Sequence, residues 1–248
     1  MSGTDDAARA ARTALEPLLA DAPAIGSGLP AGALDRLERY VALLLEANAR
    51  LNLTRVVAPP EVARWHLLDS LAALPLLSET DGPVADLGSG GGLPAVPLAI
   101  ARPDLGWTLV ESVGKKAHAL REIVEALGLE ARVVADRAET LGRDPMHRER
   151  YAAVTARAVS ALPVLAELAL PLLSVGGNLL AWKGPLTDAD DEVRRGRVAI
   201  GQLGGGPLSL QAALPALGDH TFVVVPKVRP TAARFPRRAG EPARRPLG

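Results

Sequence analysis

The stretch VADLGSGGGLPAVPLAI, residues 84–100, joins two apolar runs through a turn that holds four glycines in five positions. A strand–turn–helix unit stripped of side chains in this way lets a ligand approach the backbone closely. A phosphate-binding P-loop would end its turn in Gly-Lys-Ser or Gly-Lys-Thr, but Leu93 and Pro94 follow the glycines here. A dinucleotide fingerprint counted from Gly88 would need a glycine at its sixth position, which is again Leu93. Neither class of nucleotide loop fits.

The glycines of this turn alternate behind an acid, in the order Asp86, Gly88, Gly90 and Gly92. This pattern resembles the first motif of class I methyltransferases, which use S-adenosylmethionine. That cofactor has no phosphates and carries a sulfonium centre. It therefore needs bare backbone rather than an anion site, and an acid helps to orient a cationic ligand. We expect S-adenosylmethionine as the cofactor, with Asp86, Gly88 and Gly90 at its site.

Strands and helices alternate after residue 83. The pattern predicts strands at 84–88, 107–111, 131–135, 151–157 and 178–183, with helices from about 94, at 114–128 and at 161–173, and a turn at the glycine pair 176–177. Such alternation is typical of a mostly parallel, doubly wound α/β sheet. Two late strands near 207–213 and 220–227 predict an antiparallel hairpin at one edge. The expected fold class is a Rossmann-like class I methyltransferase.

The chain divides into three parts on its sequence pattern. Residues 1–78 show helical periodicity, including a helical run over 61–77, and predict an N-terminal helical extension. Residues 79–228 form the predicted methyltransferase domain. The last 22 residues carry seven basic residues, one acid and four prolines, so residues 229–248 are expected to be a basic flexible tail.

Composition excludes several classes of protein. The 248 residues include no cysteine, which rules out disulfides, thiolate metal sites and a cysteine nucleophile. No His, Asp and Glu spacing suggests a metal site. The N-terminus lacks a secretory signal, and the apolar run 161–173 is too short to span a bilayer. We expect a cytoplasmic protein that needs neither metal nor membrane, and nothing in the sequence requires more than a monomer.

Two further positions fit a nucleoside. Glu111 ends the second predicted strand, where a carboxylate can accept hydrogen bonds from both ribose hydroxyls. The turn Asp136-Arg137-Ala138-Glu139 follows the third strand, where the adenine would lie. The ribose argument supports a nucleoside in general rather than this cofactor in particular.

Longer segments resemble the RsmG (GidB) family, which methylates the ring nitrogen N7 of one guanine in small-subunit ribosomal RNA. The resemblance is carried in order by LNLTRV, WHLLDSL, DLGSGGGLPAVPLAIARPDL, TLVESVGKKAHALREIVEALGLE, DRAETL, VTARAVSALPVL, LPLLSVGGNLLAWKGP and VRPTAARFPRR. It implies cofactor contacts at Gly88, Leu93, Ala138, Glu139 and Arg157. One departure is Ala95, where the family usually has glycine after the first proline of its loop.

The available side chains suit N7 chemistry. Methylation of pyrimidine carbon five needs a cysteine, and methylation of exocyclic amines typically uses an Asn/Asp-Pro-Pro-aromatic motif; this chain has neither. Guanine N7 has an exposed lone pair, so alignment rather than a general base is required. Arginine is suited to guanine and to phosphate. The candidate catalytic residues lie at predicted strand ends and are Arg157, Arg137 and Lys183.

The expected partner is 16S ribosomal RNA, either free or in the small subunit. Candidate RNA contacts are Lys115, Lys116, Arg234, Arg237 and Arg238, because cations of this kind bind phosphates. His66 and Asp69, three apart on a predicted helix, would either shape the RNA side or serve a structural role. Two alternatives stay open: a small-molecule methyltransferase with the same cofactor loop, and a non-catalytic RNA-binding module that retains the fold.

Overall fold

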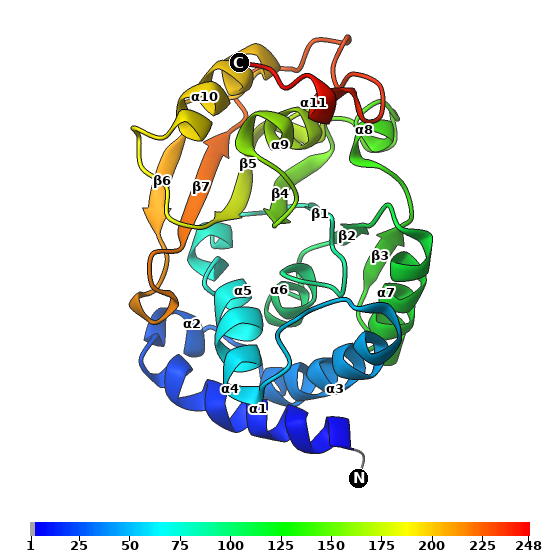
Figure 1. Cartoon of the computed structure of the whole chain (residues 1–248), viewed down its shortest axis with the longest axis vertical. Helices are drawn as coiled ribbons and strands as arrows, with labels where there is room; N and C mark the ends of the chain where they lie inside the picture. Colours follow the sequence, from blue (N-terminus) through cyan, green and yellow to red (C-terminus); the bar gives the residue numbers. More distant parts are fainter. Residues whose placement is uncertain (1–2) are drawn as a thin grey trace.

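The computed structural model describes residues 3–248, and its centre is a single twisted sheet (Figure 1). Seven strands of the described chain pair in the order β3-β2-β1-β4-β5-β7-β6. The first five in the chain are parallel, whereas β7 runs antiparallel to both β5 and β6. The mostly parallel sheet and its antiparallel edge are confirmed. The strands are β1 Val84–Leu87, β2 Trp107–Val110, β3 Ala131–Val134, β4 Tyr151–Arg157, β5 Leu173–Lys183, β6 Ser209–Ala212 and β7 Thr221–Pro226.

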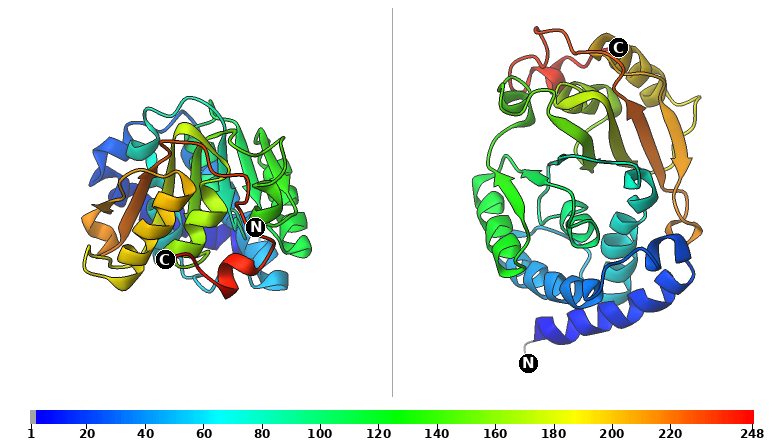
Figure 2. Two further views of the ribbon diagram at one scale, coloured as in Figure 1. Left: turned by 90° about the horizontal axis from the view of Figure 1, so that it is seen from above. Right: turned by 180° about the vertical axis from the view of Figure 1, so that it is seen from behind.

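Both faces of the sheet are covered by helices, so its central strands are mostly apolar on both faces. Successive strand residues point to opposite faces: Val84 joins one buried apolar cluster and Ala85 joins the other. Figure 2 shows the two helical layers. The first cluster includes residues of α6 Ala95–Ala101 and α7 Gly114–Ala126; the second includes residues of α8 Ala138–Leu141, α9 Leu162–Ala169 and α10 Asp191–Leu203. The chain also forms the short 3-10 helix η3 Pro215–Leu217.

The N-terminal helices belong to the first of these apolar clusters. Tyr40 is fully buried, and its hydroxyl donates a 3.0 Å hydrogen bond to the carbonyl oxygen of Gly91. A Cβ on Gly91 would stand 2.6 Å from Leu44 Cδ1, so any other residue here would force the Leu44 side chain to move. The boundary at 78/79 stays a prediction, since the two parts share one core. The elements are α1 Gly3–Ala20, α2 Pro23–Gly26, α3 Ala33–Leu51, α4 Pro59–Val62, the π-helix η1 Ala63–Leu68, α5 Asp69–Leu71 and the 3-10 helix η2 Leu74–Leu77.

Two local expectations differ from the structure. The run 61–77 is not one regular helix, because a π-helical segment and a 3-10 turn interrupt it. The glycine pair 176–177 is not a turn but lies within β5. Gly176 N donates to Lys227 O and Lys227 N donates to Gly177 O, both at 2.8 Å. A Cβ on Gly177 would lie 2.6 Å from the Ala152 carbonyl oxygen, so the pair permits close strand approach.

The C-terminal residues pack on the domain in the structure, and the flexibility expected of residues 229–248 stays a prediction. They fold back over α8 and α9 and include the short helix α11 Glu241–Arg244 (Figure 1). Arg237 forms an ion pair with Glu167, whose side chain is completely buried. Arg237 Nε lies 2.9 Å and 3.1 Å from the two carboxylate oxygens, and Arg237 N donates at 2.8 Å. A buried carboxylate requires such a partner, so this ion pair attaches the C-terminal segment to α9.

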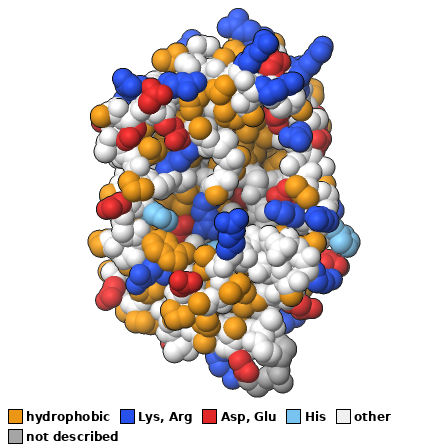
Figure 3. All heavy atoms as spheres, in the orientation of Figure 1, with side chains coloured by type: hydrophobic (Ala, Val, Ile, Leu, Met, Phe, Trp, Pro, Cys, Tyr) orange, Lys and Arg blue, Asp and Glu red, His pale blue; other side chains and the backbone are white. Residues whose placement is uncertain are grey.

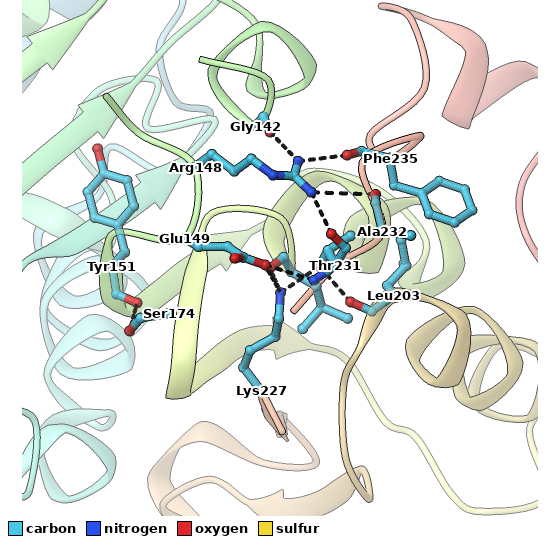
Figure 4. A network of polar contacts seen from close by, with 11 residues as sticks. Gly142, Arg148, Glu149, Tyr151, Ser174, Leu203, Lys227, Thr231, Ala232 and Phe235 are labelled. Atoms are coloured by element: carbon cyan, nitrogen blue, oxygen red, sulfur yellow. Dashed lines mark hydrogen bonds and ion pairs between the residues drawn. The ribbon is translucent and has the colours of Figure 1, made fainter. Parts of the chain in front are cut away.

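A second polar network fixes the start of this segment (Figure 4). Arg148 donates to the carbonyl oxygens of Thr231 and Phe235, at 2.6 Å and 2.7 Å. The buried Lys227 donates to Thr231 Oγ1 at 2.5 Å, and its Nζ lies 3.6 Å from Glu149 Oε1. Burial lowers the pKa of Lys227 to about 8. Side chains of the domain thus satisfy backbone carbonyl groups of the C-terminal segment, whose prolines prevent regular helix or strand hydrogen bonding. Among the described residues, no helix has the length and apolar character needed to cross a membrane.

We predict that Arg237→Ala strongly destabilises the protein. Removing one partner of a buried ion pair leaves an uncompensated charge, which typically costs about 3–5 kcal/mol. The free energy of unfolding from urea titrations measures this loss. The neighbouring exposed Arg238→Ala serves as the control and should stay within about 0.5 kcal/mol of wild type. Equal stability of the two variants would contradict an anchoring role for Arg237.

Candidate functional site

Two neighbouring cavities lie at the carboxyl edge of the parallel strands, where ligands bind in open α/β sheets. The first, of about 280 Å³, lies between the turn after β1 and the segment after β3. The second, of about 290 Å³, lies beyond the ends of β4 and β5. Val159 and Ser160 line both cavities. The two therefore form adjoining compartments along one edge.

The glycine turn forms part of the first cavity through Gly88. Its φ of +67° is in the left-handed region that favours glycine. A Cβ at this position would stand 3.0 Å from Val159 Cγ2, which also lines the cavity. A side chain here would narrow the cavity as well as strain the turn. The absence of one fits a ligand that contacts the backbone directly, as expected for S-adenosylmethionine.

Glu111 follows β2 and is buried. Its carboxylate accepts a 2.9 Å hydrogen bond from Gly90 N and a 2.7 Å bond from Val113 N. It thus joins the glycine turn to the start of α7. A carboxylate has about four acceptor positions, so these two bonds leave capacity for ribose hydroxyls. Contact of Glu111 with ribose stays a prediction.

Asp86 lies within the sheet, completely buried, and lines neither cavity. Its Oδ1 accepts a 2.6 Å hydrogen bond from Thr155 Oγ1, while Oδ2 has no hydrogen-bond partner among the described residues. Burial raises the pKa of Asp86 to about 7. Asp86 lies in β1, two residues before Gly88. Direct contact of its side chain with a cofactor stays a prediction.

The turn after β3 supplies three of the predicted residues, Arg137, Ala138 and Glu139, and all three line the first cavity. The side chain of Arg137 is exposed. Glu139 is buried, and its Oε1 accepts a 2.8 Å hydrogen bond from Gly240 N of the C-terminal segment. Leu93 is elsewhere: it packs against the first apolar cluster and lines neither cavity.

Asp69 organises the second cavity. Its Oδ2 accepts a 2.7 Å hydrogen bond from Arg157 Nη1, and its Oδ1 lies 3.1 Å from His220 Nδ1. Its backbone oxygen accepts the indole N–H of Trp182 at 2.8 Å. Arg157 Nη1 also donates to the Trp65 carbonyl oxygen at 2.9 Å. The cavity is thus lined by an arginine at the end of β4, a tryptophan of β5 and a histidine just before β7.

His66 lies in the π-helix η1, three residues before Asp69 at the start of α5, and the two side chains have different partners. His66 Nε2 lies 2.8 Å from Thr54 Oγ1. Burial lowers the pKa of His66 to about 4, which keeps its ring neutral at ordinary pH. Of the two alternatives for this pair, His66 takes the structural one, whereas Asp69 reaches the cavity.

The remaining predicted cations have different environments. Lys183 lines the second cavity, where its Nζ donates to Ser160 O at 2.8 Å and pairs with Glu192 at 2.6 Å. Lys115 is exposed and Lys116 half-buried at the start of α7. Arg234 and Arg238 are exposed. Arg237 forms an ion pair with the buried Glu167, and its contact with RNA stays a prediction.

His220 and Trp182 are functional candidates that the sequence interpretation missed. The antiparallel direction of β7 brings its first residues beside the last residues of β5, with Trp182 opposite Phe222 and Lys183 opposite Thr221. A residue just before an antiparallel strand therefore reaches the same end of the sheet as the last residues of the parallel strands. Within residues 3–248, no group of three or more His, Asp and Glu residues is arranged to hold a metal ion.

Asp86 predicts a pH dependence of stability. Its pKa is about 7 in the folded protein, against about 3.9 in an unfolded chain. Between these values the folded chain keeps a proton that the unfolded chain has lost, so stability falls as pH rises through this window. We expect the free energy of unfolding of wild type to fall relative to Asp86→Asn between about pH 4 and about pH 8. Urea titrations without cofactor measure it, and a constant difference between the two proteins is the contrary result.

Comparison with known proteins agrees with this geometry. Residues 33–213 match the GidB family model, described as rRNA small subunit methyltransferase G. A relative from Deinococcus deserti is 48% identical over 94% of this chain and 96% of its own length. One from Roseiflexus castenholzii is 45% identical over 94% of this chain and 100% of its own length. Both are named ribosomal RNA small subunit methyltransferase G.

Solved structures show the fold. The S-adenosylmethionine-dependent methyltransferase SibL in its apo form superposes with a TM-score of 0.54 at 19% identity, covering 79% of this chain and 74% of that one. An O-methyltransferase from Bacillus cereus gives a TM-score of 0.51 at 16% identity, covering 74% and 89%. The class I methyltransferase fold is thereby confirmed. On its sequence over most of its length, the chain belongs to the GidB family of rRNA small subunit methyltransferases G.

Proposed function

We propose that this protein transfers a methyl group from S-adenosylmethionine to N7 of a guanine in small-subunit (16S) ribosomal RNA. The observation that carries the proposal is the pair of adjoining cavities: one includes the side-chain-free turn, and the other is lined by Arg157. The family and the names of its members support ribosomal RNA as the substrate.

The first cavity fits the adenosine part of the cofactor. Gly88 offers bare backbone, and Ala138 and Glu139 form the turn at which adenine is expected. Glu111 keeps acceptor capacity for ribose while it holds the turn in place. When bound, S-adenosylmethionine supplies an electrophilic methyl group. These residues bind and orient it; none of them has to move a proton.

The second cavity fits a purine acceptor. Guanine N7 already carries a free lone pair, so the protein needs to hold the base in line rather than to deprotonate it. Arg157 Nη1 donates hydrogen bonds to the carboxylate of Asp69 and to the carbonyl oxygen of Trp65. The guanidinium has further donors on Nε and Nη2. A donor of this kind suits guanine O6, beside N7. Trp182 and His220 provide ring surfaces against which a base can pack.

We propose that Lys and Arg side chains at the surface bind the phosphates of the RNA. Lys and Arg side chains gather at the end of the molecule where Figure 1 places α10 and the C-terminal segment (Figure 3). Arg234 and Arg238 belong to that segment, whereas Lys115 and Lys116 begin α7. Phosphate contacts of this kind position an RNA without selecting its sequence. We further propose a monomeric protein of the cytoplasm, because the cavities are built from one chain and the substrate is ribosomal RNA.

Methyl transfer to isolated RNA tests the proposal. The protein is incubated with methyl-labelled S-adenosylmethionine and with small subunits, or their RNA, from cells that lack the gene. We expect the label in 7-methylguanosine after digestion of the RNA to nucleosides. Transfer to another atom, or no transfer to RNA, would contradict the proposal and favour the small-molecule alternative.

Substitution of Arg157 separates an enzyme from a binding module. We expect Arg157→Ala to lower kcat/KM for RNA by about 100-fold or more, since loss of one positioned donor commonly has this effect, while RNA affinity is kept. Arg157→Lys retains a charge for Asp69 but not the planar fork, so it should fold as wild type and remain impaired. Arg50→Ala, an exposed change in α3, is the control. A wild-type protein that binds RNA but no S-adenosylmethionine would instead be a non-catalytic module.

A further inference from the structure

The C-terminal segment forms part of the first cavity. Gly240 and Ala243 line it together with Gly88, Val110 and the turn after β3, although more than 80 residues of chain separate them from all of these elements. We propose that residues 240–243 are a cofactor-binding element that encloses the adenosine half of S-adenosylmethionine. This inference rests on the proposed function and deepens it, because it assigns a binding role to a segment expected to contact only RNA.

A direct contact joins this segment to the adenine turn. Gly240 N donates a 2.8 Å hydrogen bond to Oε1 of Glu139, which follows Ala138 in that turn. Gly240 has φ +79°, a conformation that favours glycine, and it caps the start of α11. The side chain of Glu139 is thus bound by the segment, and Gly240 and Glu139 line the same cavity.

The segment is anchored firmly enough to serve as a wall. Glu167 is completely buried beneath Arg237, three residues before Gly240. At the start of the C-terminal segment, Arg148 donates hydrogen bonds to the carbonyl oxygens of Thr231 and Phe235 (Figure 4). Lifting the segment would leave the carboxylate of Glu167 buried without its partner, at a high cost in free energy. The wall is therefore present before a ligand arrives.

The chemistry of the lining suits a neutral flat ring. Gly240 and Ala243 are small and uncharged, and the other apolar residues of the cavity are Leu87, Val110, Ala138, Val159, Val164 and Leu168. Apolar lining with a few polar groups is typical of sites for ring systems. None of the charged residues of the segment lines the cavity, and Arg238, Arg244 and Arg245 are exposed. The segment thus presents small residues to the cofactor cavity and arginines to the solvent.

A bulky side chain at Ala243 tests the proposal in the full-length protein. We expect Ala243→Phe to raise the Kd for S-adenosylmethionine and for S-adenosylhomocysteine at least about tenfold, or about 1.4 kcal/mol, by filling the cavity. Isothermal titration calorimetry without RNA measures both values. Ala239→Phe is the matched control, because Ala239 is an exposed alanine of the same segment that does not line the cavity. Its Kd should equal that of wild type, and the melting temperature of both ligand-free variants should be unchanged.

A second pair of variants tests the link to Glu139. Glu139→Ala removes the acceptor of the Gly240 N–H and should weaken cofactor binding severalfold, whereas Glu139→Gln retains an acceptor oxygen and should restore it.

Wild-type Kd values for Ala243→Phe would overturn the proposal that residues 240–243 enclose the cofactor. A wild-type protein that binds neither ligand would overturn the proposed function as well. Unchanged ligand binding with methylation at an atom other than guanine N7 would overturn the RNA activity alone.

Discussion

The carboxylate of Asp69 is the constraint on which the acceptor side of the site depends. It is almost completely buried and meets Arg157 from β4 and His220 from the loop before β7. The backbone oxygen of the same residue accepts the Trp182 indole from β5. One residue of an N-terminal helix thereby holds three separate strands of the sheet in a fixed arrangement. Since a buried charge must be paired, Arg157 cannot leave this position cheaply.

The N-terminal helices are consequently part of the site rather than an appendage. Besides carrying Asp69, they press Tyr40 and Leu44 against the glycine turn. The C-terminal segment plays the corresponding role at the other cavity, where Gly240 binds Glu139. The sheet supplies an edge with two cavities, and the two ends of the chain complete one cavity each. This arrangement explains how a sheet shared with many methyltransferases can be adapted to a particular acceptor.

Much of the fold and of the central site could be predicted from local pattern. The strand, glycine turn and helix of residues 84–100 have their own periodicity, and Arg157 stands at a strand end that the same periodicity locates. His220, Gly240 and Ala243 could not be predicted in this way, because their positions depend on strand direction and on long-range packing. The ion pair of Arg237 with Glu167 could not be predicted either, because nothing in the proline-rich sequence around Arg237 indicates a buried carboxylate partner in α9.

A crystal structure of the protein with S-adenosylhomocysteine tests the central claim most directly. We expect adenine in the first cavity, between the turn 136–139 and residues 240–243, with the sulfur directed toward the second cavity and Arg157. The distance from the sulfur to the Arg157 cavity would then be short enough for a base held there to reach a methyl group. A ligand bound away from Gly88, or one whose sulfur points away from Arg157, would contradict the proposed division between a cofactor cavity and an acceptor cavity.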